Sequence, residues 1–290
     1  MNTRTRKVST SDRNDILEIS RHIWDGHDYL PLVIDEWLSD QNSYTYGIEA
    51  DDHLVALANL RLIENGQTGW MEGLRVHPDY RGKGFAHILT KDLIKRARNL
   101  GVKRLRHTTS TENCASLRLA EKYGFVKILE KNVFGYPIPK DMLPSIGHLG
   151  VRKSNPREVY AMLQQNPKII PHNILFFDWK AFDCTLEALE TLGKTHEFYV
   201  ATQKGKIDSL SYAYSGLAQR RPFTIYASDT RGFLLHLSHN IALASKHGLE
   251  WVAGTCDIDF EKVLNEVEWI PEEERWSTHM ALLEKKLFKS

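Results

Sequence analysis

The chain has 290 residues, of which 42% are hydrophobic and 26% charged, and its formal net charge is +1 at pH 7. Such a length and composition are typical of a globular protein with one large domain or two smaller ones. A charge this close to neutral gives no sign of a nucleic acid or an anionic membrane surface as a partner. No apolar run approaches the roughly 20 residues that a membrane span needs.

The cysteines and the first residues of the sequence indicate the cellular compartment in which we expect the protein. Cys114, Cys184 and Cys256 lie far apart, and no CxxC pair or histidine spacing indicates a metal site. This pattern fits a reducing compartment. The opening MNTRTRKVST lacks the apolar segment of a secretory signal. We therefore expect a cytoplasmic protein with no metal, no nucleic acid partner and no membrane association.

The first half of the chain predicts a mixed sheet. Two helices are expected over 11–24 and 28–40, the first with its apolar residues on one stripe. Three strands follow, and Asn65-Gly66 favours a tight hairpin between the last two. A helix from about residue 84 to Gly101, a strand, a helix ended by Gly124 and a last strand complete the order β-α-α-β-β-β-α-β-α-β. This order predicts an α/β fold with helices on both faces of the sheet.

The second half predicts a partial repeat of that order. Three strands, a helix, a strand, a helix and a strand are expected, in order, over 197–205, 208–216, 222–229, 231–248, 249–257, 260–269 and 278–287. The stretch TRGFLLHL echoes YRGKGFAHIL of the first half but has lost one glycine and part of the loop. We interpret this as an internal duplication in which only the first half keeps a site. Six of the ten prolines fall between residues 137 and 171, which predicts a domain at 1–137, a linker at 138–155 and a second domain at 156–290.

A glycine-spaced basic loop, Arg81-Gly82-Lys83-Gly84-Phe85-Ala86, stands before the helix that begins near residue 84. Successive backbone N–H groups ahead of a helix N-terminus form a cradle for an anion, and glycines allow close approach to it. A diphosphate is the natural occupant. The P-loop pattern GxxxxGK[ST] and the dinucleotide pattern GxGxxG are both absent.

Two motifs in this order resemble the GCN5-related N-acetyltransferase (GNAT) superfamily. The loop has the family's form [RQ]xxGx[GA], and NCASLRLAEKYGF fits the pattern NxxSxxLxxxxGF downstream. The resemblance covers about residues 7–136 and is only architectural beyond. Within the superfamily, GHDYLP…WL and MEGLRVHPDYRGKGFA are most similar to the histidine N-acetyltransferase-like group of animals.

This resemblance implies a GNAT fold, with a mixed, mostly antiparallel sheet flanked by helices, in tandem with a degenerate second GNAT-like lobe. It implies acetyl-CoA as co-substrate and a small-molecule amine as acceptor, plausibly the α-amino group of an amino acid such as histidine. Pantetheine would pair with one strand, where Gly73 suits a bulge and the N–H near Leu74 faces the thioester oxygen. The cofactor-binding residues would be Leu74, Arg75, Val76, Arg81, Gly82, Lys83, Gly84, Phe85, Ala86, Asn113 and Ser116.

Glu72 is the candidate general base, with a surface or substrate-orienting role as the alternative. Asp28 and Tyr29 are the candidate substrate contacts, against a reading in which this segment only forms a turn and packs. Ala120 stands where many family members have the tyrosine that protonates the leaving thiolate, so another donor or solvent would have to do so. Nearby Tyr123 is expected to pack in the core.

Two other functions stay open at this point. One is an acetyltransferase for protein or peptide N-termini, and the other is a non-catalytic acetyl-CoA sensor, which Ala120 keeps in view. We expect a monomer or a homodimer.

Overall fold

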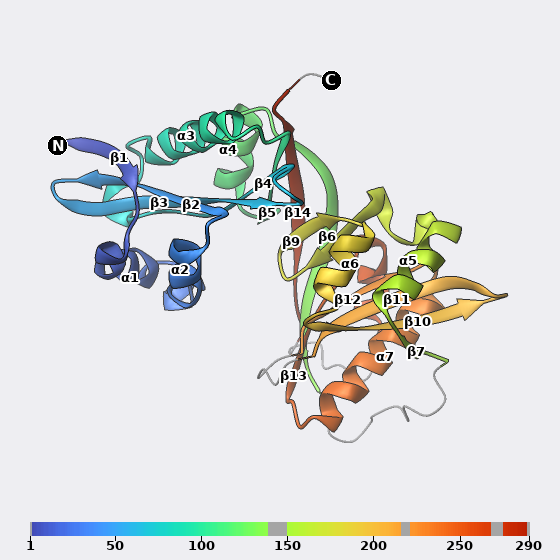
Figure 1. Cartoon of the computed structure of the whole chain (residues 1–290). Coiled ribbons are helices and arrows are strands. Elements are labelled where there is room, and N and C mark those ends of the chain that lie inside the picture. Colours follow the sequence, from blue (N-terminus) through green and yellow to red (C-terminus); the bar gives the residue numbers. More distant parts are fainter. Residues whose placement is uncertain (1, 139–149, 216–220, 268–274, 289–290) are drawn as a thin grey trace. The chain divides into compact units, whose positions relative to one another are not determined.

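The computed structural model describes residues 2–138, 150–215, 221–267 and 275–288. The chain forms two compact units, and each contains a segment from the other half of the sequence (Figure 1). The first unit comprises Met1–His107, Ala115–Val126 and Leu283–Ser290, and the second comprises Thr108–Cys114 and Lys127–Leu282. The domain boundaries 1–137, 138–155 and 156–290 stay a prediction, and residues 139–149 of the expected linker lie outside the described residues.

The first half of the chain has the predicted order of elements. These are β1 (Thr3–Lys7), α1 (Arg13–Arg21), α2 (Leu30–Ser39), β2 (Ser43–Ala50), β3 (His53–Ile63), β4 (Thr68–Val76), α3 (Phe85–Asn99), β5 (Arg104–Ser110), α4 (Cys114–Lys122) and β6 (Val126–Pro137). The strand order in the first unit is β1-β2-β3-β4-β5, followed by the end of β14 (Trp276–Lys286). Strands β1 to β4 pair antiparallel, and β4 pairs parallel with β5.

Helices cover both faces of the first unit's sheet (Figure 1). On one face, apolar residues of α1 and α2 pack on β3 around Leu54 and Leu57. On the other face, α3 and α4 pack around Leu60 and Leu105. The two apolar faces explain why β3 reads as a nearly continuous hydrophobic run, since a strand covered on both sides buries every residue.

The end of the chain completes the sheet of the first unit. The N–H of Leu287 donates to the carbonyl of Lys103 at 2.9 Å. Arg106 Nε donates to Glu284 Oε2 at 2.8 Å, with side chains only 4% and 11% exposed. A buried ion pair therefore fixes the C-terminal strand beside β5.

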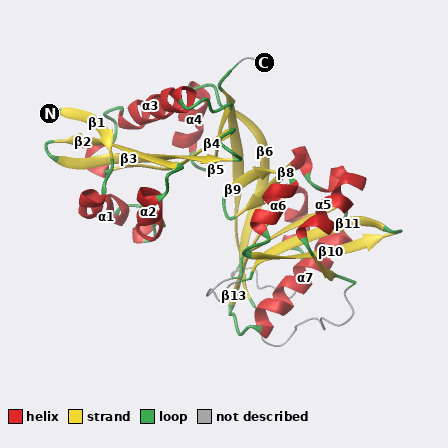
Figure 2. Ribbon diagram, in the orientation of Figure 1, coloured by secondary structure: helices red, strands yellow, loops and turns green. Residues whose placement is uncertain are grey.

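The second unit contains the predicted strands and helices and several more. Besides β6 and β14, the elements of the second half of the chain are β7 (Arg152–Ser154), α5 (Pro156–Gln165), β8 (Ile174–Phe177), β9 (Lys180–Asp183), α6 (Leu186–Leu192), β10 (His196–Gln203), β11 (Lys206–Tyr214), β12 (Phe223–Ala227), α7 (Thr230–Lys246), β13 (Trp251–Asp257) and α8 (Glu261–Asn265). Its strand order is β14-β6-β13-β12-β11-β10-β7, with β8 and β9 as a separate hairpin. Helix α7 covers one face, and α5 and α6 cover the other (Figure 2). This is the mixed α/β architecture that the sequence predicts, present twice.

No helix among the described residues is long and apolar enough to span a membrane.

Candidate functional site

Strands β4 and β5 separate partway along their length. Their parallel pairing covers Thr68 with Arg104, Gly69 with Leu105 and Trp70 with Arg106, and extends no further among the described residues. Beyond Trp70, β4 pairs only with β3. One backbone edge of residues 71–76 therefore lacks a strand partner, although the carbonyls of Leu74 and Val76 accept hydrogen bonds from Arg75 and Arg81. An extended ligand could pair with this edge like an added strand.

A β-bulge at Gly73 and Leu74 reshapes this edge, as the sequence predicts. Leu57 lies opposite Arg75 and Asn59 opposite Glu72, so the bulged residues together face the single residue between them on β3. Gly73 has φ +66°, and a Cβ there would lie 2.4 Å from the Trp37 ring. Any other residue at position 73 would clash with Trp37 as well as strain the backbone.

The glycine-spaced loop leads from β4 into α3 in the conformation that an anion cradle requires. Gly82 has φ +75° and Gly84 has φ +82°. The first helical hydrogen bond runs from the N–H of Ile88 to the carbonyl of Gly84 at 3.1 Å, so the N–H groups of the three preceding residues lie ahead of it. With the positive end of the helix dipole, these donors suit a diphosphate.

Basic side chains border the loop. Arg81 Nε donates to the carbonyl of Val76 at 3.3 Å, which ties the loop to the end of β4. Lys83 is exposed, and its Nζ lies 4.4 Å from the centre of the Tyr80 ring. The two cations can add charge stabilisation to whatever anion the loop holds.

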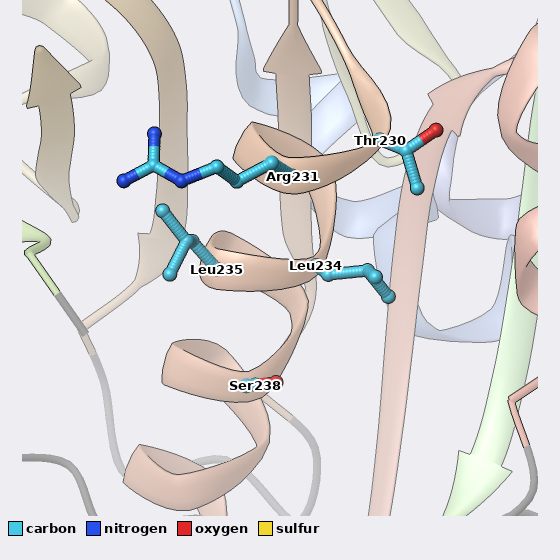
Figure 3. Close-up of a pocket in the computed structure, with 5 residues that line it drawn as sticks. All are labelled: Thr230, Arg231, Leu234, Leu235 and Ser238. Atoms are coloured by element: carbon cyan, nitrogen blue, oxygen red, sulfur yellow. The ribbon is translucent and has the colours of Figure 1, made fainter. Parts of the chain in front are cut away.

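The corresponding helix of the second unit is closed to an anion. Asp229 caps α7, and its carboxylate accepts a hydrogen bond from the N–H of Gly232 at 2.8 Å. A shallow pocket of about 540 Å³ lies along the first turns of this helix (Figure 3), lined by Thr230, Arg231, Leu234, Leu235 and Ser238. None of these residues belongs to the loop at 81–86. Because Asp229 already occupies the helix N-terminus with negative charge, a diphosphate has no place there.

Glu72 lies within a polar cluster on β3 and β4. Its Oε1 accepts a hydrogen bond from Asn59 Nδ2 at 3.1 Å and lies 3.3 Å from Arg61 Nε. Asn59 is fully buried and also accepts hydrogen bonds from Ser43 and Thr45 on β2. The carboxylate is only 9% exposed, so it is held in one orientation.

Arg75 and Asp28 form a bidentate ion pair. Arg75 Nη2 lies 2.9 Å from Asp28 Oδ1, and Nε lies 3.0 Å from Oδ2. The Asp28 side chain has no exposed surface, and its Oδ1 also accepts from the N–H of Leu30 at 3.3 Å. Burial alone would lower the pKa of Arg75, but the hydrogen bonds and charge of Asp28 outweigh it and raise the pKa. Asp28 therefore fixes the entry to α2 onto β4, and direct contact with a substrate stays a prediction.

Two aromatic rings cover the Arg75 guanidinium. Its central carbon lies 4.9 Å from the centre of the Trp24 ring and 5.4 Å from that of the Tyr29 ring. Trp24 is 61% exposed and Tyr29 37%. Burial raises the pKa of Tyr29, Arg75 opposes the shift and Glu72 adds to it.

Helix α4 offers no free tyrosine hydroxyl for the departing thiolate. Ala120 is buried, at 3% exposure. Tyr123 packs against the core of the first unit, and its hydroxyl donates to the carbonyl of His87 at 2.9 Å. Ser116 lies in the first turn of α4, and the N–H of Asn113, just before the helix, donates to Ser110 at 3.0 Å. Cofactor contacts by Asn113 and Ser116 stay a prediction.

His107 stands on β5 just past the last pairing with β4. Its ring meets Phe125 edge-on at 5.0 Å, and Nδ1 has no hydrogen-bond partner among the described residues. Burial lowers the pKa of His107 to about 4, so the ring is neutral at physiological pH.

The sequence motifs did not indicate four neighbours of the site, Asn59, Arg61, Trp24 and Trp37. The sequence did contain a signal for Asn59 and Arg61. Asn59 and Arg61 interrupt the apolar run of β3 two residues apart, so they share one face of the strand. Trp37 belongs to the motif GHDYLP…WL, but neither the motif nor Trp24 indicated a role, because only the fold brings these rings to Gly73 and Arg75.

Comparison with known proteins identifies the protein family that part of the chain matches. Residues 13–125 match the sequence profile of the Acetyltransferase (GNAT) family. The fold is similar to that of a tandem GNAT protein from the clavulanic acid biosynthesis pathway, with a TM-score of 0.61, 11% identity and full coverage of both chains. The profile match assigns residues 13–125 to the GNAT family, and the structural match shows that the chain has a tandem GNAT-like fold.

Within the superfamily, the chain is similar to histidine N-acetyltransferases. It is 38% identical over 84 residues to the histidine N-acetyltransferase of Scomber australasicus, covering 29% of this chain and 25% of that protein. It is 25% identical over 184 residues to that of Xenopus tropicalis, covering 58% of this chain and 56% of that protein. These alignments thus span between a quarter and about half of the length of the relatives.

Proposed function

We propose that the protein is an acetyl-CoA-dependent N-acetyltransferase that acts on a small amine. One observation carries the proposal: a bulged strand with a free edge leads directly into a helix N-terminus with two left-handed glycines. The loop can hold the diphosphate of acetyl-CoA, while the edge of β4 can hold its pantetheine arm.

The cofactor would bind in an extended form along the first unit. The backbone of Gly82, Lys83 and Gly84 and the first N–H groups of α3, from Phe85 and Ala86, would bind the diphosphate, with Arg81 adding charge. The backbone of Leu74 and Val76 would pair with the pantetheine amides. The bulge supports this arrangement, because Gly73 and Leu74 lie outside the regular pairing of β4 with β3, and the N–H of Leu74 would then bind the thioester oxygen.

Acetyl transfer then requires an uncharged amine. Glu72 would accept a proton from the incoming ammonium, directly or through water, since its position is fixed by Asn59 and Arg61. The amine nitrogen attacks the thioester carbonyl, and the tetrahedral oxyanion is stabilised by the N–H near Leu74. The extra proton on nitrogen would pass to water as the C–S bond breaks, so that the acetyl group stays on nitrogen as a neutral amide and CoA departs as a thiolate.

The thiolate would take its proton from solvent. Tyr123 donates its hydroxyl to His87, and His107 is neutral at physiological pH. A neutral imidazole is a poor acid, and a CoA thiol is acidic enough for water to complete the step.

A free amino acid, with histidine as the leading example, is the proposed acceptor. The histidine N-acetyltransferases to which the chain is similar support it. The aromatic faces of Trp24 and Tyr29 beside Arg75 also suit an acceptor with a flat or charged side chain. Acetylation of protein or peptide N-termini is the alternative, and a non-catalytic acetyl-CoA sensor is favoured only by Ala120.

The experiment that tests the proposal measures release of free CoA thiol from acetyl-CoA. Purified protein is assayed against the free amino acids, polyamines and short peptides, with acetyl-CoA binding measured in parallel. We expect one amino acid to respond far above the rest. Turnover with peptides alone would show that the acceptor is a peptide and not a free amino acid. Tight acetyl-CoA binding without turnover on any amine would favour the sensor.

A further inference from the structure

We propose that Glu18, His22 and His77 form a binding site for a divalent transition-metal ion, with Zn²⁺ as the best match. One ligand atom of each residue lies within 4.8 Å of the other two. Glu18 lies in α1, His22 directly follows α1 as its C-cap residue, and His77 directly follows the last residue of β4, all within the first unit. None of the three side chains belongs to the proposed acetyl-transfer machinery, although His77 directly follows Val76 of the proposed pantetheine strand. The site can be tested whether or not the acceptor is found.

Two of the ligands already have the spacing that one ion requires. Glu18 and His22 are four residues apart at the end of α1, so they share one helix face, the spacing used by paired ligands on metal-binding helices. His22 Nε2 lies 3.3 Å from Glu18 Oε1. Zinc bonds of about 2.0–2.1 Å in a tetrahedral site put neighbouring ligand atoms about 3.3–3.4 Å apart. An ion could therefore replace this contact without moving either backbone.

His77 supplies the third ligand from another element. Its backbone N–H donates to Val55 at 2.9 Å, which fixes the end of β4. The rings of His22 and His77 meet edge to face, with centroids 5.4 Å apart. His77 Nδ1 accepts a hydrogen bond from the backbone N–H of Asp79 at 3.3 Å and lies 3.9 Å from Asp79 Oδ2. An ion bound through Nε2 would place the ring proton on Nδ1, and the Asp79 carboxylate is then the nearby acceptor for it.

Two imidazoles and a carboxylate are a donor set that suits Zn²⁺, and three protein ligands leave one position open. His22 is exposed, so the site opens to solution. Arg21 Nη1 lies 2.6 Å from Glu18 Oε2, the carboxylate oxygen that faces away from His22. Because an ion must share Glu18 with this cation, we expect weaker binding than in a closed four-ligand site.

The test is direct titration of the full chain, stripped of metal with a chelator, with Zn²⁺ alone. Calorimetry should give one site per chain, and His22→Ala and His77→Gln should each weaken it at least tenfold. His53→Ala is the matched control, because this exposed histidine of the first unit also lies 3.3 Å from a carboxylate, that of Asp15, outside the cluster. Its affinity should equal that of the wild type.

Titration with Co²⁺ gives a second readout, since the intense visible absorption of four-coordinate cobalt should appear in the wild type and disappear in His22→Ala. Absence of Zn²⁺ binding in the wild type would overturn the proposal, as would equal affinity in the wild type, His22→Ala and His77→Gln. If His77→Gln does not fold, His22→Ala decides alone, because the exposed His22 ring can be removed without disturbing the core. Its thermal unfolding in chelator should match that of the wild type.

Discussion

At the scale of single residues, the site contains two carboxylates with different surroundings. Both oxygens of Asp28 bind the guanidinium of Arg75, and the side chain is sealed from solvent. The contacts of Glu72 with Asn59 and Arg61 both use Oε1. A carboxylate that shares one oxygen with neutral and cationic donors can still accept a proton on the other. Glu72 is thus the better candidate for proton transfer, and Asp28 for positioning.

Replacing Glu72 by Gln tests this division. The amide keeps the size of the side chain but cannot act as a base, so we expect kcat/KM to fall by about 10²–10³, with acetyl-CoA affinity unchanged. Because the amine must then lose its proton before it reacts, the rate of the variant should rise with pH over the whole range in which the acceptor deprotonates. Steady-state kinetics from about pH 6 to 9.5, the range that spans deprotonation of an amine acceptor, give both results.

The matched control is Glu36→Gln. Glu36 Oε1 lies 2.8 Å from Arg61 Nη1, and its side chain is 64% exposed, so this variant perturbs Arg61 without touching Glu72. Its kcat/KM should stay within about twofold of the wild type, because an exposed ion pair contributes little. A Glu72→Gln enzyme with the rate and pH profile of the wild type would remove Glu72 from the mechanism.

At the scale of elements, the two lobes differ at the start of one helix. Helix α3 begins at Gly84, which has no side chain, whereas α7 begins after Asp229, whose carboxylate binds the N–H of Gly232. The same positive helix end is therefore open in one lobe and neutralised in the other. This physical difference accounts for the loss of the glycine pattern in the second copy.

Replacing Gly84 by Val should abolish tight acetyl-CoA binding. The residue has φ +82°, where a β-branched side chain is strained, and the side chain would enter the space of the diphosphate. We expect affinity in calorimetry to fall at least 100-fold, with a loss of about 1–3 kcal/mol in unfolding free energy.

Gly66→Val separates strain from ligand exclusion. Gly66, in the turn between β3 and β4, has φ +77° and, like Gly84, no atom within 4 Å of the point where a Cβ would lie. It should lose similar stability but bind acetyl-CoA as the wild type does. Retained binding in Gly84→Val would disprove the loop assignment.

An ionic cluster in the second unit links β10 to its neighbours. Burial alone would raise the pKa of Glu197, but Lys153, Tyr199 and Arg221 outweigh it and lower the pKa to about 2. Because the folded-state pKa lies below the ordinary value of about 4.3, the stabilisation is complete above that value and is lost as the pH falls toward 2.

Glu197→Gln should therefore lower the unfolding free energy by about 2 kcal/mol at pH 7, and the deficit should shrink between about pH 4.5 and 2. Urea unfolding at a series of pH values measures it. Glu190→Gln, which breaks the more exposed pair with Arg157, serves as control and should change stability by less than about 0.5 kcal/mol at every pH. A deficit for Glu197→Gln that does not vary with pH would contradict the assignment.

Elements with strong local patterns could be predicted from the sequence, and those without could not. Helix α3 and the β3–β4 hairpin follow from apolar periodicity and from Asn65-Gly66. Helix α5 was not predicted, because it lies in a proline-dense stretch typical of a connector. Pro156 lies in the first helical turn, where proline is favoured, and Asn155 accepts a hydrogen bond from the N–H of Glu158 at 3.0 Å.

The parts of the site that depend on contacts between distant segments could not be predicted from the sequence. The motifs predicted the loop and the bulge, because each depends on neighbouring residues. The pairing of Asp28 with Arg75 and the approach of His77 to Glu18 depend on how α1 and α2 pack against β4, which no local pattern encodes. For the same reason, the local conformation of the loop was predictable and the packing around Arg75 was not.

At the scale of the whole molecule, the order of the sequence does not separate the two units. Strand β6 belongs largely to the second unit, and residues Leu283–Ser290 belong to the first. The first unit, which carries the proposed cofactor site, therefore depends on the last residues of the chain. Arg106 is the residue that reveals this dependence, because its guanidinium is buried beside Glu284.

Replacing Glu284 by Gln should destabilise the first unit although the residue is near the C-terminus. The substitution removes the charge of one of the two carboxylates beside the buried Arg106 guanidinium, the other being Glu64 at 3.8 Å, which we expect to cost about 2 kcal/mol. Because Arg106 also lies opposite Trp70 at the last pairing of β4 with β5, acetyl-CoA affinity should fall several-fold. Thermal unfolding with and without acetyl-CoA measures both effects. Glu266→Gln, at an exposed pair with Lys262, should change neither, and a Glu284→Gln protein as stable as this control would show that the first unit does not need the C-terminal strand.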